Sequence, residues 1–199
     1  GKVAINHPQG KNLIGAFYQP KLVVADIKVL ATLEERQLRA GLAEVIKYGV
    51  IWDEEFFNFL AKKQKKILNL DQETMIHVIK KSCQVKAKVV AQDERETGLR
   101  AILNYGHTLG HALEAVTDYQ RYVHGEAVAI GILGAAKLAY KLGMLTREDL
   151  KVQKELINSY GLPISFSDLN EEDIVQALTK DKKVKDGVLR FILARNIGE

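Results

Sequence analysis

Two histidines one helical turn apart give this sequence its clearest chemical signature. His107 and His111 lie in a segment that also carries Arg100, Asn104 and Glu114. At 100° per residue on a helix, these five polar side chains fall within an arc of about 80°. Two imidazoles at this spacing can share one metal ion or one substrate. The stripe of polar residues therefore predicts a site of binding or catalysis on one helix face.

The composition of this stripe differs from that of an ordinary solvent-facing helix surface. It has no lysine and a single glutamate, although these residue types dominate the other polar faces of the chain. Gly106 and Gly110 flank it, and each glycine costs about 1 kcal/mol in a helix interior. We therefore expect another group to approach the backbone closely at these two positions.

A carboxylate, an amine and a third imidazole lie in apolar or small-residue surroundings elsewhere in the chain. Glu44 and Lys47 are three residues apart and share a helix face, which is also the spacing of a purely structural ion pair. His124 begins a later predicted helix, whose dipole favours the neutral imidazole that binds metals. Taken alone, each of these residues also has an ordinary structural explanation.

Together, these groups could form a metal site. A catalytic zinc ion takes three protein ligands and keeps one coordination position open. One carboxylate and two or three of the imidazoles of His107, His111 and His124 could converge on it from three helices. The spacing favours His107 and His111 as joint ligands. It leaves Glu44 and Glu114 open as alternatives for the carboxylate.

The elements that must position these residues are mainly helical. Apolar periodicity predicts about seven helices, with one short β-strand near each end of the chain. Residues 1–20 are rich in proline and glycine and predict a loop, whereas 21–26 and 188–194 predict the two strands. The predicted helices span about 32–51, 53–67, 71–92, 100–117 and 124–142, and two more follow Thr146 and Asn170. The helix over 124–142 is apolar nearly all round, which predicts a buried central position.

Composition excludes several functional classes. The 199 residues are 47% hydrophobic and 27% charged, as in globular proteins. A net charge of +4, with lysines that do not gather in one arm, argues against nucleic-acid binding. A single cysteine excludes an internal disulfide and favours a reducing compartment such as the cytoplasm. The sequence has no apolar run long enough to span a membrane. Both ends resemble the interior of a longer protein, so we expect a fragment.

Several motifs in order resemble those of the 3-dehydroquinate synthase family. They lie at residues 1–3, 10–17, 43–49, 86, 93–100, 103–114, 124–131 and 181–183. The resemblance runs over essentially all 199 residues and covers the helical C-terminal half of that enzyme. It implies that residues 1–30 join a missing N-terminal NAD-binding domain to a helical metal- and substrate-binding domain over 31–199.

The resemblance also implies a reaction. A sugar-acid phosphate, 3-deoxy-arabino-heptulosonate 7-phosphate, becomes 3-dehydroquinate and phosphate through NAD-dependent oxidation, phosphate elimination, reduction and an intramolecular aldol step. This reaction belongs to the shikimate pathway of aromatic amino-acid biosynthesis. The implied cofactors are NAD+ and one divalent metal ion, Zn2+ or Co2+. We expect a cytoplasmic enzyme, and the resemblance is compatible with a homodimer. We expect neither a nucleic acid nor a membrane as a partner. The isolated fragment is expected to be inactive.

The family's motifs assign roles to individual residues. Glu44, His107 and His124 would bind the metal ion, which replaces the pairing of His107 with His111 that spacing favours. His111 and Glu96 would transfer protons. The substrate would be bound by Lys2, Asn12, Lys47, Lys86, Arg100, Asn104 and one of Lys182 and Lys183, of which we assign Lys183. The cofactor would be contacted by Lys11, Val29, Leu30, Ala31 and Thr32.

Three alternatives remain at this point. Related sugar-phosphate cyclases, of the 2-deoxy-scyllo-inosose synthase or valiolone-forming type, would share the metal site and the NAD chemistry. The basic substrate-binding set favours dehydroquinate synthase over them, because its substrate carries a carboxylate as well as a phosphate. A metal-dependent glycerol dehydrogenase would share the two-domain plan. A non-catalytic helical module would bind metal only structurally.

Overall fold

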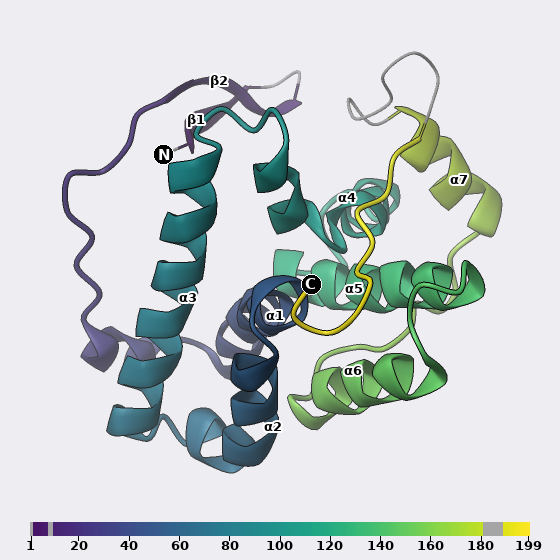
Figure 1. The fold of residues 1–199 in the computed structure, drawn as a ribbon. Helices are drawn as coiled ribbons and strands as arrows, with labels where there is room; N and C mark the ends of the chain where they lie inside the picture. The colour runs from purple at the N-terminus through teal and green to yellow at the C-terminus, as the bar shows by residue number, and fades with distance from the viewer. Residues whose placement is uncertain (1, 8–9, 181–188) are drawn as a thin grey trace.

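The computed structural model describes residues 2–7, 10–180 and 189–199. In this part of the chain, a two-stranded antiparallel hairpin precedes a body of helices (Figure 1). The strands are β1 (Lys2–His7) and β2 (Gly10–Phe17), and the 3-10 helices are η1 (Ile27–Thr32) and η2 (Leu99–Asn104). The α-helices are α1 (Glu35–Trp52), α2 (Glu54–Leu68), α3 (Gln72–Gln92), α4 (His107–Val116), α5 (His124–Lys141), α6 (Arg147–Ser159) and α7 (Glu171–Lys180). The mainly helical fold class is therefore confirmed.

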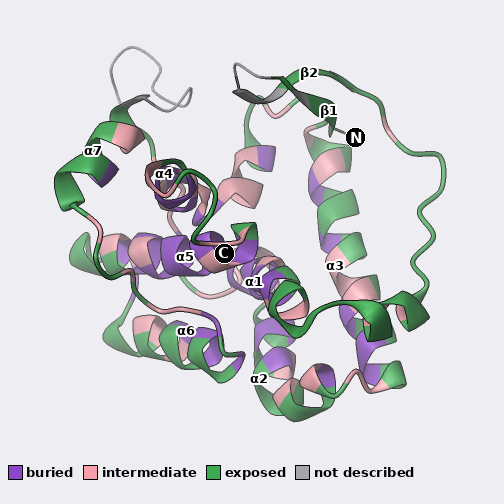
Figure 2. Cartoon of the chain, turned by 180° about the vertical axis from the view of Figure 1, so that it is seen from behind, coloured by how far each residue is buried: buried purple, intermediate pink, exposed green. Residues whose placement is uncertain are grey.

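Helix α5 lies at the centre of the helical body, as its sequence predicts. Helices α1, α4 and α6 pack against it, and Figure 2 shows the buried residues concentrated where these helices meet. Every residue from 127 to 133 is buried, because a helix that is apolar on all sides is stable in water only when it is covered on all sides. Even so, none of the described helices is long and apolar enough to cross a membrane.

Side-chain caps set the starts of several helices where the sequence predicts them. The Asp53 carboxylate accepts a hydrogen bond from the Phe56 amide at 2.8 Å and begins α2. The Asp71 carboxylate caps α3. Thr146 and Asp149 cap α6 reciprocally, because each side chain bonds the other's amide. Each cap satisfies backbone donors that have no partner inside the helix.

The predicted start of the first helix at Thr32 is wrong. The Thr32 hydroxyl donates to the Val29 carbonyl at 2.9 Å and thereby closes η1. Helix α1 begins three residues later, at Glu35, without a side-chain cap. A short 3-10 turn competes successfully for the threonine hydroxyl, because that hydroxyl reaches the carbonyl three residues back.

The strand predictions at both ends are also wrong. Residues 2–17, expected as loop, form the hairpin, in which Lys2 pairs with Phe17 and Ile5 with Ile14. Residues 21–26 form no strand, and none is present over 189–194. Both segments contain β-favouring residues, yet β-propensity produces a strand only where a partner strand is available. Residue 188 and the predicted polar turn over 181–187 lie outside the described residues.

The stripe helix is two elements rather than one. Residues 99–104 form η2, and α4 begins at His107. Between them Gly106 takes a φ of +79°, in the left-handed region that L side chains rarely adopt. The chain therefore turns between Asn104 and His107, so a single helical wheel does not describe the whole stripe.

Candidate metal centre

Glycines bring the three helices of the site into backbone contact. A Cβ atom on Gly125 would lie 1.9 Å from the Ala40 carbonyl oxygen, so the start of α5 meets α1 at a distance that only glycine allows. A Cβ atom on Gly131 would lie 1.9 Å from the Gly106 carbonyl oxygen, which ties α5 to the start of α4. A close approach at Gly106 and Gly110 is thus confirmed, and the group that approaches them is the backbone of α5.

A second tie between α1 and α5 is electrostatic. The Arg36 guanidinium on α1 donates to both carboxylate oxygens of Glu126 on α5, at 2.8 and 2.7 Å. The same carboxylate accepts the Val123 amide and so caps the first turn of α5. This planar two-point contact fixes direction as well as distance. It therefore holds the first turn of α5, which begins with His124, in register with α1.

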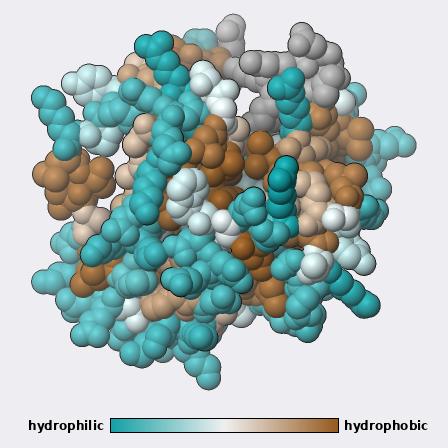
Figure 3. Space-filling model, viewed as in Figure 1, coloured by the Kyte–Doolittle hydropathy of each residue, from teal (hydrophilic) through white to brown (hydrophobic). Residues whose placement is uncertain are grey.

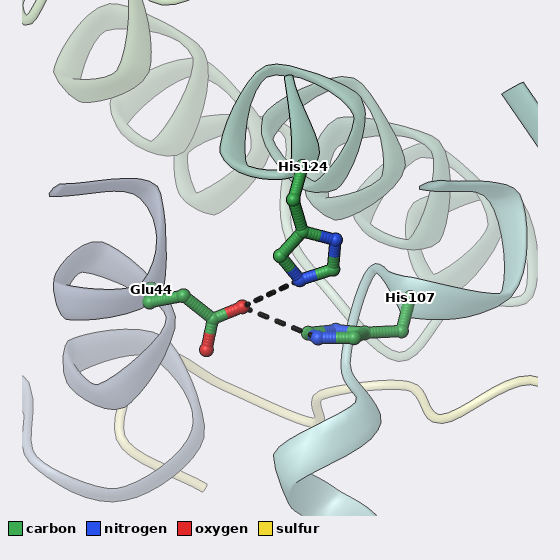
Figure 4. A group of neighbouring side chains, drawn as sticks. All are labelled: Glu44, His107 and His124. Atoms are coloured by element: carbon green, nitrogen blue, oxygen red, sulfur yellow. Dashed lines mark ion pairs between the residues drawn. The ribbon is translucent and has the colours of Figure 1, made fainter. Parts of the chain in front are cut away.

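Glu44, His107 and His124 converge where α1, α4 and α5 meet (Figure 4). The Glu44 Oε1 atom lies 3.2 Å from His107 Nε2 and 3.7 Å from His124 Nε2. Ligand atoms from these three residues all lie within 4.8 Å of one another. Each residue comes from a different helix, so the group exists only because the tertiary fold assembles it.

These distances fit a divalent metal ion. Two ligands about 2.0–2.1 Å from a tetrahedral zinc ion are about 3.3 Å apart, close to the two separations observed. Glu44 Oε1 is buried and accepts no well-formed hydrogen bond from the described residues. A buried carboxylate oxygen without such a donor is costly unless a cation satisfies it. The donor set of one carboxylate and two imidazoles is also one that zinc prefers.

Lys47 fixes the other oxygen of the same carboxylate. Its buried Nζ atom donates to Glu44 Oε2 at 2.6 Å and to the Leu103 carbonyl at 2.6 Å. Burial alone would raise the pKa of Glu44, but the close approach of the His107 and His124 imidazoles and the charge of Lys47 outweigh it and lower that pKa well below its usual range. Burial lowers the pKa of Lys47, although Glu44 opposes this. Glu44 is thus an ionised carboxylate with one oxygen aimed at the two imidazoles.

The other ring nitrogens of the two histidines contact acceptors. His124 Nδ1 lies 3.3 Å from both carboxylate oxygens of Glu114, and His107 Nδ1 lies 3.2 Å from the Tyr105 carbonyl. The contact of Nδ1 with the Glu114 carboxylate, and secondarily the approach of the Glu44 carboxylate, raise the pKa of His124 to about 9 despite partial burial. Each Nδ1–H can therefore be held by an acceptor while Nε2 faces the site.

His111 lies beside this group without belonging to it. Its ring centroid is 5.5 Å from that of His107 and 6.1 Å from that of His124. Its nearest grouping of metal-ligating atoms is instead with Glu114 and His124. The structure therefore groups His107 with Glu44 and His124, as the family motif implies, rather than with His111, as the spacing favours.

The predicted substrate residues on the stripe lie around the loop before η2. Asp93 accepts backbone hydrogen bonds from Thr97, Gly98 and Arg100, which hold this loop closed. The buried Arg100 guanidinium donates to the Glu94 carbonyl, while its Nε atom has no acceptor among the described residues. It also lies over the Phe17 ring of β2, 5.9 Å from the ring centroid. The loop and the hairpin are thus in contact.

Asn104 and Glu96 form one pair next to this loop. The Asn104 side-chain amide donates to the Glu96 carboxylate at 2.6 Å. Glu96 has a φ of +62°, in the left-handed region, so its backbone is strained. The structure thus pairs a predicted proton acceptor with a predicted substrate ligand.

For the remaining predicted site residues, the structure gives fewer contacts. Lys86 on α3 is exposed, and its charge contributes to the lowered pKa of Lys47. Only backbone positions are described for Lys2 on β1 and for Lys11 and Asn12 on β2. Lys183 lies outside the described residues. The other predicted cofactor residues are the last four residues of η1: Val29, Leu30, Ala31 and Thr32. Leu30 is half-buried and the other three are exposed.

Glu114, which the spacing leaves open as an alternative to Glu44 for the carboxylate ligand, is buried against His124. Its position on the polar stripe, three residues after His111, was the available signal. The carbonyl of Leu103 and the Arg36–Glu126 pair were missed entirely. No signal in the sequence could have identified them, because both depend on contacts between distant helices.

Comparison with known proteins identifies the family. The model of the 3-dehydroquinate synthase C-terminal domain matches residues 41–184, and the model of the N-terminal domain matches residues 1–40. A 3-dehydroquinate synthase of Thermoanaerobacter pseudethanolicus is 50% identical over 199 residues, and one of Crocosphaera subtropica is 55% identical over 203. Both alignments cover all of this chain and 56% and 55% of the relatives. The chain thus spans about half the length of these curated relatives.

Solved structures agree with this result. One is a 2-epi-5-epi-valiolone synthase of Streptomyces hygroscopicus, solved with NAD+ and Zn2+ bound, which superposes with a TM-score of 0.89 at 27% sequence identity. This match covers all of the present chain and 55% of the valiolone synthase chain. A 2-deoxy-scyllo-inosose synthase complexed with carbaglucose-6-phosphate, NAD+ and Co2+ gives 0.76 at 28% identity, with the same coverage. With the family model matching residues 41–184, the chain belongs to the 3-dehydroquinate synthase family.

Proposed function

We propose that the protein carrying this chain is a cytoplasmic 3-dehydroquinate synthase, and that residues 31–199 supply its metal site and most of its substrate site. The observation that supports this most is the group of Glu44, His107 and His124, at separations that suit one divalent ion. The family assignment and the relatives about half identical in sequence supply the reaction. The substrate is 3-deoxy-arabino-heptulosonate 7-phosphate, and the products are 3-dehydroquinate and phosphate.

The metal and the cofactor are part of this proposal. Glu44, His107 and His124 would hold a Zn2+ or Co2+ ion, which would supply Lewis-acid polarisation of substrate oxygens, and bound NAD+ would supply reversible hydride transfer. Lys47 keeps Glu44 ionised and oriented, since it holds Oε2 while Oε1 faces the imidazoles. The solved relatives contain NAD+ together with Zn2+ or Co2+, which supports the same pair of cofactors here.

Proton transfer and substrate binding are assigned to the surrounding side chains. His111 lies one turn beyond His107 and can exchange a proton with a group bound beside the metal site. Glu96 would act as a second proton acceptor, at the position where Asn104 holds its carboxylate. Lys2, Asn12, Lys86, Arg100, Asn104 and Lys183, together with Lys47, would bind the carboxylate, hydroxyl and phosphate groups. A predominantly basic set suits a doubly anionic substrate.

The NAD-binding partner would be a domain that packs on the hairpin and the segment after it. Val3, Ile5 and Phe17 are more than half exposed, and Leu22, Val23 and Val24 are 66–79% exposed. Figure 3 shows hydrophobic side chains at the left edge of the view, where this segment runs. Residues 1–40 match the N-terminal domain of the family. We infer that this apolar surface is covered by the rest of that domain, and that residues 1–30 join the two domains.

A related sugar-phosphate cyclase is the second candidate, because the solved structures described above are two such enzymes. Their identities of 27% and 28% are about half those of the dehydroquinate synthases, which favours the latter. The substrates separate the two functions, because only dehydroquinate synthase requires the carboxylate of its sugar acid.

The test measures phosphate release by the whole protein with NAD+ and Zn2+. We expect release from 3-deoxy-arabino-heptulosonate 7-phosphate, none from a sugar phosphate without the carboxylate, and loss of activity in Glu44→Ala. Equal release from both substrates would favour the cyclase. Residues 1–199 alone should bind zinc weakly and release no phosphate, because half of the cofactor site is absent. Turnover by this segment near that of the whole protein would contradict the two-domain proposal.

A further inference from the structure

Glu114 is a buried carboxylate that contacts one of the metal-site histidines from the side opposite the site. We propose that Glu114 is a positioning residue, whose carboxylate accepts the Nδ1–H of His124 and so presents His124 Nε2 to the metal ion. This inference rests on the proposed metal site. It gives Glu114 a role in metal affinity without making it a ligand.

The geometry separates the two sides of the His124 ring. Nδ1 lies 3.3 Å from each oxygen of Glu114, whereas Nε2 lies 3.7 Å from Glu44 Oε1. A neutral imidazole carries its proton on one nitrogen and offers the lone pair of the other. A carboxylate beside Nδ1 favours the proton there, which leaves the lone pair on Nε2. A carboxylate in this position also makes the ring a stronger ligand.

Exposure shows why His124 needs such a partner. The His124 side chain is 43% exposed, whereas that of His107 is 12% exposed. Packing therefore restrains the ring of His107 more than that of His124. Glu114 is itself only 4% exposed and cannot follow a rotating imidazole into solvent. A fixed acceptor on α4 thus supplies the restraint that packing does not give His124.

A competing role for Glu114 is visible in the same region. Ligand atoms of His111, Glu114 and His124 also lie within 4.8 Å of one another, which is a grouping that could bind a second metal ion. In that arrangement His124 would use Nδ1 as a ligand, and this nitrogen could not carry a proton. The two roles therefore predict different metal stoichiometries.

The experiment compares Glu114→Ala and Glu114→Gln with the wild type in the whole protein. Zinc affinity is measured by competition with a chromophoric chelator, and Co2+ is substituted to record the visible spectrum of the bound ion. We expect Glu114→Ala to weaken zinc binding about 10–100-fold and to alter the Co2+ spectrum. Glu114→Gln keeps an acceptor at the same reach, so it should lose several-fold less affinity and keep the wild-type spectrum.

Leu113→Ala is the matched control, because Leu113 is fully buried on the same helix, next to Glu114 in sequence. It should lower the melting temperature and leave zinc affinity and the Co2+ spectrum unchanged. Wild-type affinity in Glu114→Ala, or an equal loss in Leu113→Ala, would overturn the positioning role alone. Two zinc ions per wild-type chain and one per chain of Glu114→Ala would show that Glu114 is a metal ligand, and would also overturn the positioning role. A wild-type protein that binds no zinc would overturn both this inference and the proposed function.

Discussion

The contact between Gly125 and α1 offers a direct way to separate two of the predicted metal ligands. In Gly125→Ala, the new methyl group would lie 1.9 Å from the Ala40 carbonyl oxygen. Carbon and oxygen atoms in close contact are normally about 3.3 Å apart, so the backbones of α1 and α5 must separate by about 1.4 Å. His124 is the neighbouring residue, and Glu44 lies one turn beyond Ala40 on α1.

This displacement is large for a metal site. Metal–ligand distances are held to within about 0.2 Å, whereas the shift is several times larger. We therefore expect Gly125→Ala to weaken zinc binding at least tenfold, which corresponds to about 1.4 kcal/mol. The same overpacking should destabilise the metal-free protein by about 1–3 kcal/mol. The assays are chelator competition for zinc and chemical denaturation of the metal-free protein.

Gly41→Ala is the control, because Gly41 lies on α1 directly after Ala40 but is exposed, and a Cβ atom there would meet no atom within 4 Å. Alanine should stabilise α1 by about 0.5–1 kcal/mol, as is usual in a helix interior, and leave zinc affinity unchanged. Zinc affinity in Gly125→Ala equal to that of Gly41→Ala would refute the claim that this backbone contact sets the ligand geometry.

Two further predictions concern stability. Tyr160→Phe removes the buried hydroxyl that donates to the Leu60 carbonyl at 2.9 Å. The free energy of unfolding should therefore fall by about 1 kcal/mol. An unchanged denaturation curve would show that this hydrogen bond does not stabilise the protein. Backbone hydrogen bonds from Thr97, Arg100 and Gly98 lower the pKa of Asp93 to about 2. The ionised carboxylate should therefore stabilise the loop fully above the ordinary pKa of 3.8, and this stabilisation should be lost as the pH falls through about 2. An NMR titration of Asp93 tests this, and a midpoint near 3.8 would contradict it.

The sequence predicts those features that depend on local chemistry. The apolar run after His124 predicts the buried central helix, and Asp71 and Thr146 predict helix starts, because caps act on neighbouring backbone amides. The continuous stripe helix fails because Gly106 turns the chain, which a helical wheel does not include. The terminal strands fail because pairing depends on a partner that local propensity does not supply.

The metal site likewise has features that local sequence predicts and features that depend on tertiary contacts. Spacing along one helix identifies His107 and His111 as candidates, but it pairs the wrong two residues for the grouping that the structure forms. Glu44 and His124 join His107 through contacts between three helices. Residue types made both of them candidates, but only the family motif selected this set of three. The position of Lys47 on Glu44 is likewise a tertiary feature, since its second acceptor is the carbonyl of Leu103, 56 residues away.

The most direct test of the account is the zinc affinity of four single variants of the whole protein. If Glu44, His107 and His124 are the ligands, Glu44→Ala, His107→Ala and His124→Ala should each lose zinc binding. His111→Ala should keep about one zinc ion per chain at an affinity close to that of the wild type. A loss in His111→Ala as large as that in His107→Ala would contradict the assignment.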